Sequence, residues 1–190
     1  MRIILASASP RRGRLLLKLV EKFTVIPAHI DEKIRKNETF ARACVRLARE
    51  KTRAIAKKNP SSLVIGADTV AYLGKRNFRK TDDARAAREI LLLLSGKTHT
   101  VATGVAVILP DGQEIAYCER AHVKMKVLSH RALGGYLKTG EWKGRAGSYD
   151  VSGKGKRLIA RVQGEKETVV GLPLKKLKSI LRENALRRQR

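Results

Sequence analysis

An aspartate interrupts an apolar stretch of the chain, LVIGADTVAYL at residues 63–73. Apart from Asp68 and Thr69, this stretch has the composition of a buried β-strand. Aspartate is a poor strand former, and burying a carboxylate without a partner is costly. The pattern therefore predicts that a cation, a metal ion or a hydrogen-bond network stabilises Asp68. The alternative is an aspartate that forms a turn after Gly66.

A lysine lies on the apolar face of the amphipathic helix that the sequence predicts for residues 39–58. The residues of this face follow one another at spacings of four, three, four and four: Phe40, Cys44, Leu47, Lys51 and Ile55. Because residues at these spacings share one side of a helix, Lys51 would point inward as a functional cation. The alternative is a lysine at the edge of the face, whose stem is buried and whose ammonium group reaches water.

Two arginines open the first predicted helix. Ser9 and Pro10 are typical of an N-cap and a first helical residue, because a serine oxygen accepts a free backbone N–H and proline has none to offer. Arg11 and Arg12 then fall in the first turn, where the helix dipole is already positive. Arginines beside free backbone N–H groups form a good phosphate site. The alternative is a basic turn exposed to solvent.

An acidic pair, Asp31 and Glu32, stands out in a chain with 17 acidic and 42 basic residues. Carboxylates together with water suit Mg²⁺ or Mn²⁺, whereas the alternative is a salt-bridged loop. With the cations described above, these groups are the components of metal-assisted phosphate chemistry. The sequence has neither a P-loop pattern nor a Rossmann glycine signature, so the predicted site is of another kind.

The formal net charge of +25 favours polyanionic partners. A phosphate-bearing ligand fits this charge, and a nucleic acid is a second candidate. Aromatic residues, at 4%, are few for stacking on bases. Basic residues occur along the whole chain, so the alternative is a general basic bias of the surface.

A length of 190 residues suits one domain, 1–190, with a basic C-terminal tail at about 183–190. No apolar run approaches the ~20 residues of a membrane span, so no membrane partner is expected. The apolar run at the N-terminus is too short for a secretory signal, which predicts a cytoplasmic protein. Cys44 lies in a helical pattern and Cys118 in a strand-like one, and both are expected to be buried thiols.

Helical and strand-like segments are mixed along the chain, which predicts an α/β fold with a mixed sheet. Strands are predicted at 3–6, 23–27, 63–73, 99–109, 113–127 and 157–164. Helices are predicted at about 10–20, 39–58, 84–94, 129–138 and 172–184. Asp82 or Asp83 would cap the third helix. Loops are predicted at 74–83 and in the glycine-rich segment 140–156.

Seven sequence blocks between residue 3 and about residue 180 carry a resemblance. They are LASASPRRGRLL, DE at 31–32, RLAREK ending at Lys51, GADTV, RKTDDARAAREILLLLSGKTHTV, YLKTGEWKGRAGSY and VVGLPL. In this order they resemble the blocks of the Maf nucleotide pyrophosphatases. A Ser-Pro-Arg start followed by ADTV and LSGKTH is highly specific, and the resemblance covers nearly the whole chain.

The resemblance implies a mixed, twisted β-sheet flanked by helices, with two lobes around a cleft as in the related inosine triphosphate pyrophosphatases, and often a homodimer. It implies hydrolysis of a nucleoside triphosphate to the monophosphate and pyrophosphate, with Mg²⁺ or Mn²⁺ as cofactor. Asp68 falls where the family has its general base, and Glu32 matches the acidic residue near metal and substrate. Both are expected at the metal. The triphosphate-binding set of the family matches Ser9, Arg12, Lys51 and Lys80.

Three positions in the family distinguish which nucleobase its branches accept. At two of them, Arg11 and Thr69 resemble the dTTP/UTP branch. The third, a glutamine in that branch, is Ser152, which cannot make the paired hydrogen bonds of a glutamine. Arg145 stands where a lysine is usual and Thr81 where a proline is usual.

We expect hydrolysis of dTTP and UTP, with a role in clearing non-standard nucleotides. The alternatives are 7-methyl-GTP, another modified nucleotide or a deaminated purine as substrate, and a basic nucleic-acid-binding protein without catalysis.

Overall fold

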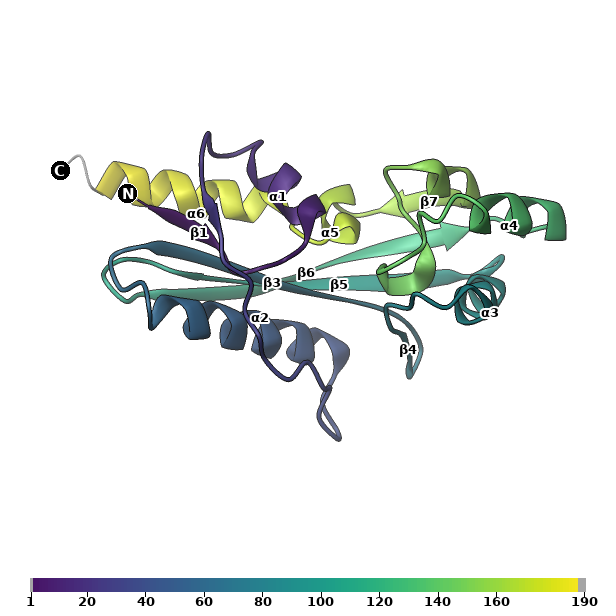
Figure 1. Cartoon of the computed structure of the whole chain (residues 1–190), viewed down its shortest axis with the longest axis horizontal. Coiled ribbons are helices and arrows are strands. Elements are labelled where there is room, and N and C mark those ends of the chain that lie inside the picture. Colours follow the sequence, from purple (N-terminus) through teal and green to yellow (C-terminus); the bar gives the residue numbers. More distant parts are fainter. Residues whose placement is uncertain (1, 188–190) are drawn as a thin grey trace.

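A seven-stranded mixed β-sheet runs through the molecule from end to end (Figure 1). The structure, a computed structural model, describes residues 2–187, and of residues 185–187 the backbone alone. The strand order is β2-β1-β3-β5-β6-β7, with β4 paired to β3. Strand β1 is parallel to β2 and β3, and the other pairs are antiparallel. The strands are β1 (Ile3–Leu5), β2 (Thr24–Val25), β3 (Leu63–Leu73), β4 (Arg76–Phe78), β5 (Thr98–Ile108), β6 (Glu114–Met125) and β7 (Ile159–Gln163).

One edge of β3 is paired at both ends and open in the middle. Strand β1 pairs with residues 63–65 of β3, and β4 pairs with residues 71–73. On the other edge, β3 pairs with β5 without interruption from Val64 to Tyr72. In the part of the chain that the structure describes, residues 66–70 therefore have no strand partner on the first edge. Asp68 lies in the middle of this opening.

Helix α2 (Phe40–Ala56) covers one face of the sheet, against β3 and β5 (Figure 1). The helix begins after Thr39, whose side chain accepts a hydrogen bond from the backbone N–H of Arg42. This is the expected N-cap geometry, because the first N–H groups of a helix have no partner inside it. The buried face of α2 includes Lys51, as its spacing predicts.

The opposite face carries α1 (Pro10–Leu16), α5 (Lys166–Val170) and α6 (Leu174–Arg187) (Figure 1). Buried leucines of α1 and α6 form one apolar cluster with inward side chains of β1, β3 and β5. Burial of this apolar surface holds α1, and with it the preceding loop, against the start of β3. The first turn of α1 therefore lies beside the open edge.

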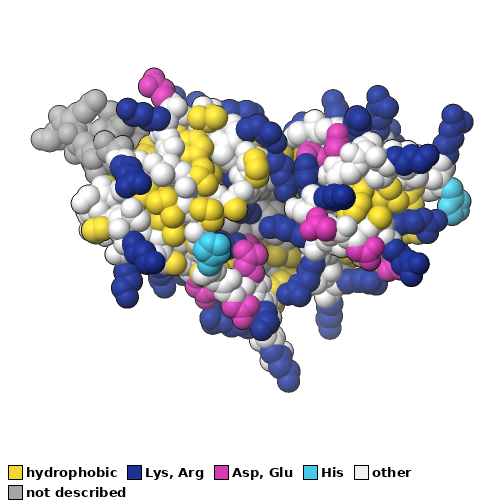
Figure 2. All heavy atoms as spheres, viewed as in Figure 1, with side chains coloured by type: hydrophobic (Ala, Val, Ile, Leu, Met, Phe, Trp, Pro, Cys, Tyr) yellow, Lys and Arg dark blue, Asp and Glu magenta, His cyan; other side chains and the backbone are white. Residues whose placement is uncertain are grey.

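A second apolar cluster lies at the other end of the sheet. There α3 (Ala84–Leu94) and α4 (His130–Leu137) pack with two 3₁₀ helices, η1 (Ala146–Ser148) and η2 (Lys154–Leu158), against β5 and β6. Figure 2 shows a notch between the two ends of the molecule, where Lys and Arg side chains gather. A twisted mixed sheet with helices around it and a cleft between two ends confirms the predicted fold class.

Most predicted elements are confirmed, and the differences concern short segments. Strand β4 forms where a loop is predicted, because its three residues pair with the end of β3. Helix α5 is not predicted, and α1 ends at Leu16, so its predicted extension to about residue 20 is wrong. Ser9 occupies the N-cap of α1, but its side chain makes no capping hydrogen bond. Of the two candidate caps of α3, Asp83 is the one that accepts a backbone N–H.

The structure describes both cysteines and part of the predicted basic tail. Cys44 is buried as predicted, whereas Cys118 is half-buried, so the prediction of burial is wrong for Cys118. Of the predicted basic tail, residues 183–187 continue α6, and residues 188–190 lie outside the described residues. Within residues 2–187, no helix combines the length and apolar character that a membrane span requires.

Replacement of Gly104 by alanine is expected to destabilise the protein. A Cβ at this position of β5 would lie 2.3 Å from the carbonyl carbon of Cys44 in α2, so strand and helix would have to separate. Overpacking of a core costs about 1–3 kcal/mol and occasionally more. Gly134→Ala in α4 is the control, because nothing lies within 4 Å of a Cβ there. Chemical denaturation measures both free energies of unfolding, and equal values would contradict the close approach.

Candidate active site

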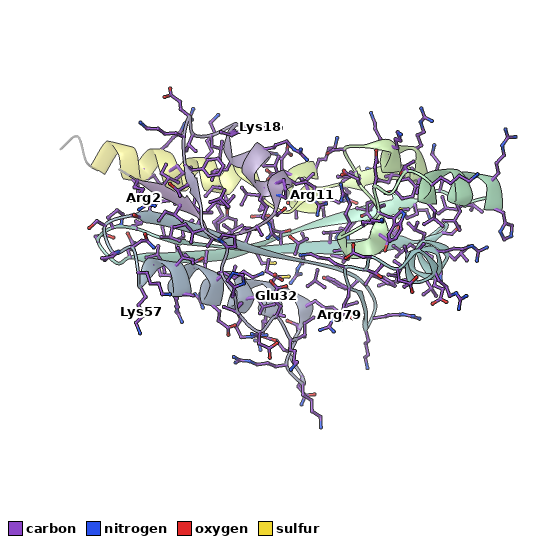
Figure 3. All side chains as sticks on the ribbon, in the orientation of Figure 1. Arg2, Arg11, Lys18, Glu32, Lys57 and Arg79 are labelled. Carbon is purple, nitrogen blue, oxygen red and sulfur yellow. The ribbon has the colours of Figure 1, made fainter. Side chains whose placement is uncertain are left out.

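Three neighbouring cavities of about 370, 600 and 30 Å³ lie at the open edge of β3. All three are lined by Lys80, which follows β4. Figure 3 places Arg11 on one side of the sheet and Glu32 on the other, so the cavities extend around the sheet edge. Every predicted site residue except Ser152 lines at least one cavity: Ser9, Arg11, Arg12, Glu32, Lys51, Asp68, Thr69 and Lys80.

The ammonium group of Lys51 connects two carboxylates. Its Nζ lies 2.6 Å from Oδ1 of Asp68 and 2.6 Å from Oε1 of Glu32. Lys51 and Asp68 are each only 5% exposed, so a lysine at the edge of the helix face and an aspartate in a turn are both wrong. Asp68 pairs with Gly104 inside the strand. The partner that a buried Asp68 needs is therefore Lys51.

Glu32 comes from the loop between β2 and α2, and its side chain is 51% exposed. Partial burial raises the pKa of Glu32, but the hydrogen bond from Lys51 and the charges of Lys51 and Lys80 outweigh it, so the pKa is lowered overall. Glu32 is therefore an anion at neutral pH. Asp31, its neighbour, also lines the cavity at Asp68 and forms an exposed ion pair with Lys33 at 3.5 Å.

The guanidinium group of Arg12 is buried and held by three hydrogen bonds. Its Nε donates to the backbone oxygen of Gly171 at 2.8 Å. Its Nη1 donates to Oγ of Ser7, and its Nη2 donates to Oγ1 of Thr69, both at 3.0 Å. Burial lowers the pKa of Arg12, while the charge of Asp68 raises it in part. These contacts fix a cation at the cavity wall and join α1 to β3.

Arg11 and Lys80 are two further cations at the cavities, and the pKa of each is lowered. Arg11 reaches the backbone oxygen of Gly144 only at 3.5 Å. Burial, followed by repulsion from Arg145, lowers its pKa to about 10, so it stays charged at neutral pH. Lys80 presents its surface to the cavities, yet desolvation by the surrounding protein and repulsion from Arg12 lower its pKa. An anion in the cavities would relieve these repulsions.

Ser152 lies outside the three cavities, with its side chain exposed. Its backbone N–H donates to Oδ1 of Asp150 at 2.8 Å. The other oxygen of Asp150 accepts from Nη2 of Arg145 at 2.8 Å. Arg145 lines the largest of the three cavities, so the loop that contains Ser152 is tied to the site through Asp150.

Sequence reasoning missed Ser7, Thr103 and Asp150 as residues that support the site. Thr103 pairs with Thr69 in the β3–β5 register, and their hydroxyl groups lie 2.9 Å apart. Thr103 also donates to the backbone oxygen of Thr168, just inside α5. Thr103 interrupts the apolar part of β5 from Val101 to Ile108, which was a signal, but its partner depends on strand register.

Within residues 2–187, no group of three or more His, Cys, Asp or Glu side chains is arranged to hold a metal ion. Asp68 and Glu32 nevertheless bring two hard oxygen donors to one cation, the ammonium of Lys51. Mg²⁺ commonly takes one or two protein carboxylates and completes its shell with water and substrate phosphates. The donor set therefore fits a metal ion that is bound together with a phosphate ligand, and not one caged by the protein.

Replacement of Lys51 by methionine is expected to lower the free energy of unfolding by about 3 kcal/mol or more, because it leaves the buried Asp68 carboxylate unpaired. Adding Asp68→Asn should restore most of the loss, since the amide carries no charge. Lys57→Met, an exposed lysine at the end of the same helix, is the control. Denaturant titrations of the four proteins test the pair, and an equal loss in the single and double variants would contradict it.

A family model described as Maf-like protein matches residues 2–184. The dTTP/UTP pyrophosphatase of Hyphomonas neptunium is 42% identical over 187 residues, which cover 98% of this chain and 97% of that protein. That of Caulobacter vibrioides is 43% identical over 173 residues, 90% of each chain. A solved HAM1 protein from Coxiella burnetii, with 14% identity and a TM-score of 0.52, covers 96% of this chain and 99% of that one and resembles it in fold. The match over nearly the full length shows that this chain belongs to the Maf-like protein family.

Proposed function

We propose that this protein hydrolyses a nucleoside triphosphate to the monophosphate and pyrophosphate. The observation that carries the proposal is the buried Asp68 carboxylate, which is paired with Lys51 at the wall of a cavity. A carboxylate in this position can accept a proton from a water molecule inside the cavity. The names of the relatives from Hyphomonas neptunium and Caulobacter vibrioides support the same reaction.

The charge of the largest of the three site cavities suits a polyphosphate. One carboxylate, Glu32, lines it together with seven side chains of Lys and Arg. Arginine and lysine bind phosphate oxygens by charge-assisted hydrogen bonds, and arginine does so in a fork. The cationic residues lining this cavity are Arg11, Arg12, Arg14, Lys51, Lys80, Lys143 and Arg145. We therefore place the triphosphate in this cavity.

In the proposed reaction, a water oxygen bonds to the α-phosphorus while Asp68 accepts the proton of that water as general base. The bond between the α-phosphorus and the α–β bridging oxygen breaks, and pyrophosphate leaves with the electron pair. Lys51 keeps the Asp68 carboxylate oriented towards the cavity. Arg12 and Lys80 stabilise the negative charge that develops on the phosphates, which is the larger part of catalysis in phosphoryl transfer.

We further propose that a divalent cation, Mg²⁺ or Mn²⁺, takes part in the reaction. Asp68 and Glu32 would hold it together with oxygens of the substrate. When bound, it would neutralise phosphate charge and polarise the phosphorus–oxygen bonds. Because the protein contributes two carboxylates, the affinity for the metal alone should be weak and should rise with the nucleotide present.

We propose that the nucleobase of the substrate is thymine or uracil, so that dTTP and UTP are the substrates. Arg11 and Thr69 support this proposal because they resemble the dTTP/UTP branch, and the names of the two relatives agree with it. The 2.9 Å contact between Thr69 and Thr103 also fixes the Thr69 hydroxyl group. Ser152 is exposed and does not line the three cavities, and its backbone N–H is bonded to Asp150, so the proposal assigns Ser152 no contact with the nucleobase. A homodimer and a cytoplasmic location stay predictions.

The net charge of +25 supports binding of RNA or DNA as a second candidate function. Such binding would weaken steeply as the salt concentration rises, because each contact with a phosphate releases counterions. It would also survive Asp68→Asn, which removes the proposed base and leaves the basic surface intact. The buried ion pair favours the enzyme, since a binding surface does not require one.

Asp68→Asn is expected to lower kcat by about 10²- to 10⁴-fold, because it removes the general base, while the protein stays folded. The assay measures pyrophosphate release from dTTP, UTP, 7-methyl-GTP, dITP and the other common nucleoside triphosphates, with Mg²⁺ or Mn²⁺. Asp111→Asn, in the exposed β5–β6 turn, is the matched control and should retain full activity. If the wild-type protein releases no pyrophosphate from any nucleotide, the proposed function is wrong. Turnover of Asp68→Asn within twofold of wild type would remove Asp68 from the role of base.

A further inference from the structure

Arg46, on α2, has every donor of its guanidinium group engaged. Its Nε and Nη2 fork onto the two oxygens of Glu38, both at 2.8 Å. Its Nη2 also donates to the backbone oxygen of Lys33 at 2.9 Å, and its Nη1 lies 3.1 and 3.2 Å from the two oxygens of Glu50. The side chain of Arg46 is only 16% exposed and that of Glu38 only 12%.

These contacts hold the segment that carries Glu32. Residues 26–39 contain no helix or strand, so the backbone there has few hydrogen bonds of its own. Lys33, whose carbonyl Arg46 binds, directly follows Glu32 in the chain. Glu38 is at the far end of the same segment, and Arg35 within it contacts Glu50 at 3.1 Å. The guanidinium of Arg46 thus joins both ends of residues 33–38 to α2.

Two side chains of helix α2 therefore hold the part of the loop around Glu32. Lys51 binds the Glu32 carboxylate, and Arg46, five residues earlier in the helix, binds the backbone after it. A single ion pair to a side chain that is 51% exposed is a weak constraint, because ordering a flexible loop costs conformational entropy. The contacts of Arg46 reduce that cost before the ion pair forms.

We propose that Arg46 is a positioning residue for the reaction at Asp68, acting through Glu32. Its contacts with Lys33 and Glu38 keep the loop in the conformation in which the Glu32 carboxylate meets Lys51 beside Asp68. This inference rests on the proposed pyrophosphatase function. It assigns Arg46 no contact with the substrate.

The role requires arginine rather than any cation. A lysine has one nitrogen with three donors and cannot span Glu38, Glu50 and the Lys33 carbonyl at once. Arg46→Lys should therefore keep the charge and lose part of the positioning, and Arg46→Met should lose all of it. Arg53→Met is the matched control, because Arg53 lies on the same helix and forks onto Glu114 at 2.6 and 3.1 Å, away from the loop.

The first measurement is amide hydrogen exchange of residues 31–38 in the protein without nucleotide, which is independent of activity. Exchange in this segment should become faster in Arg46→Met, less so in Arg46→Lys, and should be unchanged in Arg53→Met. Exchange in β3 should be the same in all four proteins. Unchanged exchange at residues 31–38 in Arg46→Met would overturn the proposal.

The second measurement is the kinetics of pyrophosphate release from the preferred nucleotide. Residues that orient a reacting or metal-binding group typically cost about 10- to 100-fold when lost, and a fall of this size in kcat is expected for Arg46→Met. On a Glu32→Gln background the same substitution should cost less than threefold, because the group that Arg46 positions is already disabled. A full loss on that background would overturn the action through Glu32.

The two measurements separate the possible failures. Absence of pyrophosphate release by the wild-type protein would refute the proposed function, while the exchange experiment would still decide whether Arg46 orders the loop. Faster exchange together with unchanged kcat in Arg46→Met would overturn the proposal while the pyrophosphatase function stands. Should Arg46→Met fail to fold, Arg46→Lys, which keeps the charge, carries both measurements.

Discussion

The ion pair between Lys51 and Asp68 is the interaction on which the rest of this site depends. A carboxylate inside a β-sheet is destabilising unless a charge or several donors compensate it. Here one ammonium group compensates two carboxylates, with both N–O distances at 2.6 Å. The ammonium comes from a helix, one carboxylate from a strand and the other from a loop. One ammonium group therefore joins three elements at two neighbouring cavities.

The interrupted edge of β3 explains why the site lies where it does. Strand β1 covers the first residues of β3 and β4 covers the last, which leaves residues 66–70 without a strand partner on that side among the described residues. Side chains on both faces of β3 can then reach the same opening. Asp68 meets Lys51 on the α2 side, and Thr69 meets Arg12 on the side of α1. The Arg46 contacts extend this arrangement to the loop that carries Glu32.

Elements with a strong local pattern were predictable. The long β3, the hairpin of β5 and β6, and the capped helices α2 and α3 agree with their apolar spacing and cap residues. Strand β4 was not predictable, because its three residues are a strand only by pairing with β3. Helix α5, with five residues, is too short to show a period. Its end is set by Gly171, whose φ of 117° few other residues adopt.

Local sequence identifies the residues that could do chemistry, because a carboxylate and a lysine in apolar patterns are costly to bury and each therefore needs a partner. It did not determine that they were each other's partner, since Lys51 and Asp68 are 17 residues apart and meet only when α2 packs on β3. The Thr69–Thr103 contact likewise follows from strand register, and the Arg46–Lys33 contact from the path of a loop without regular structure. These contacts form only in the folded chain, because each depends on packing between segments that local preferences do not place.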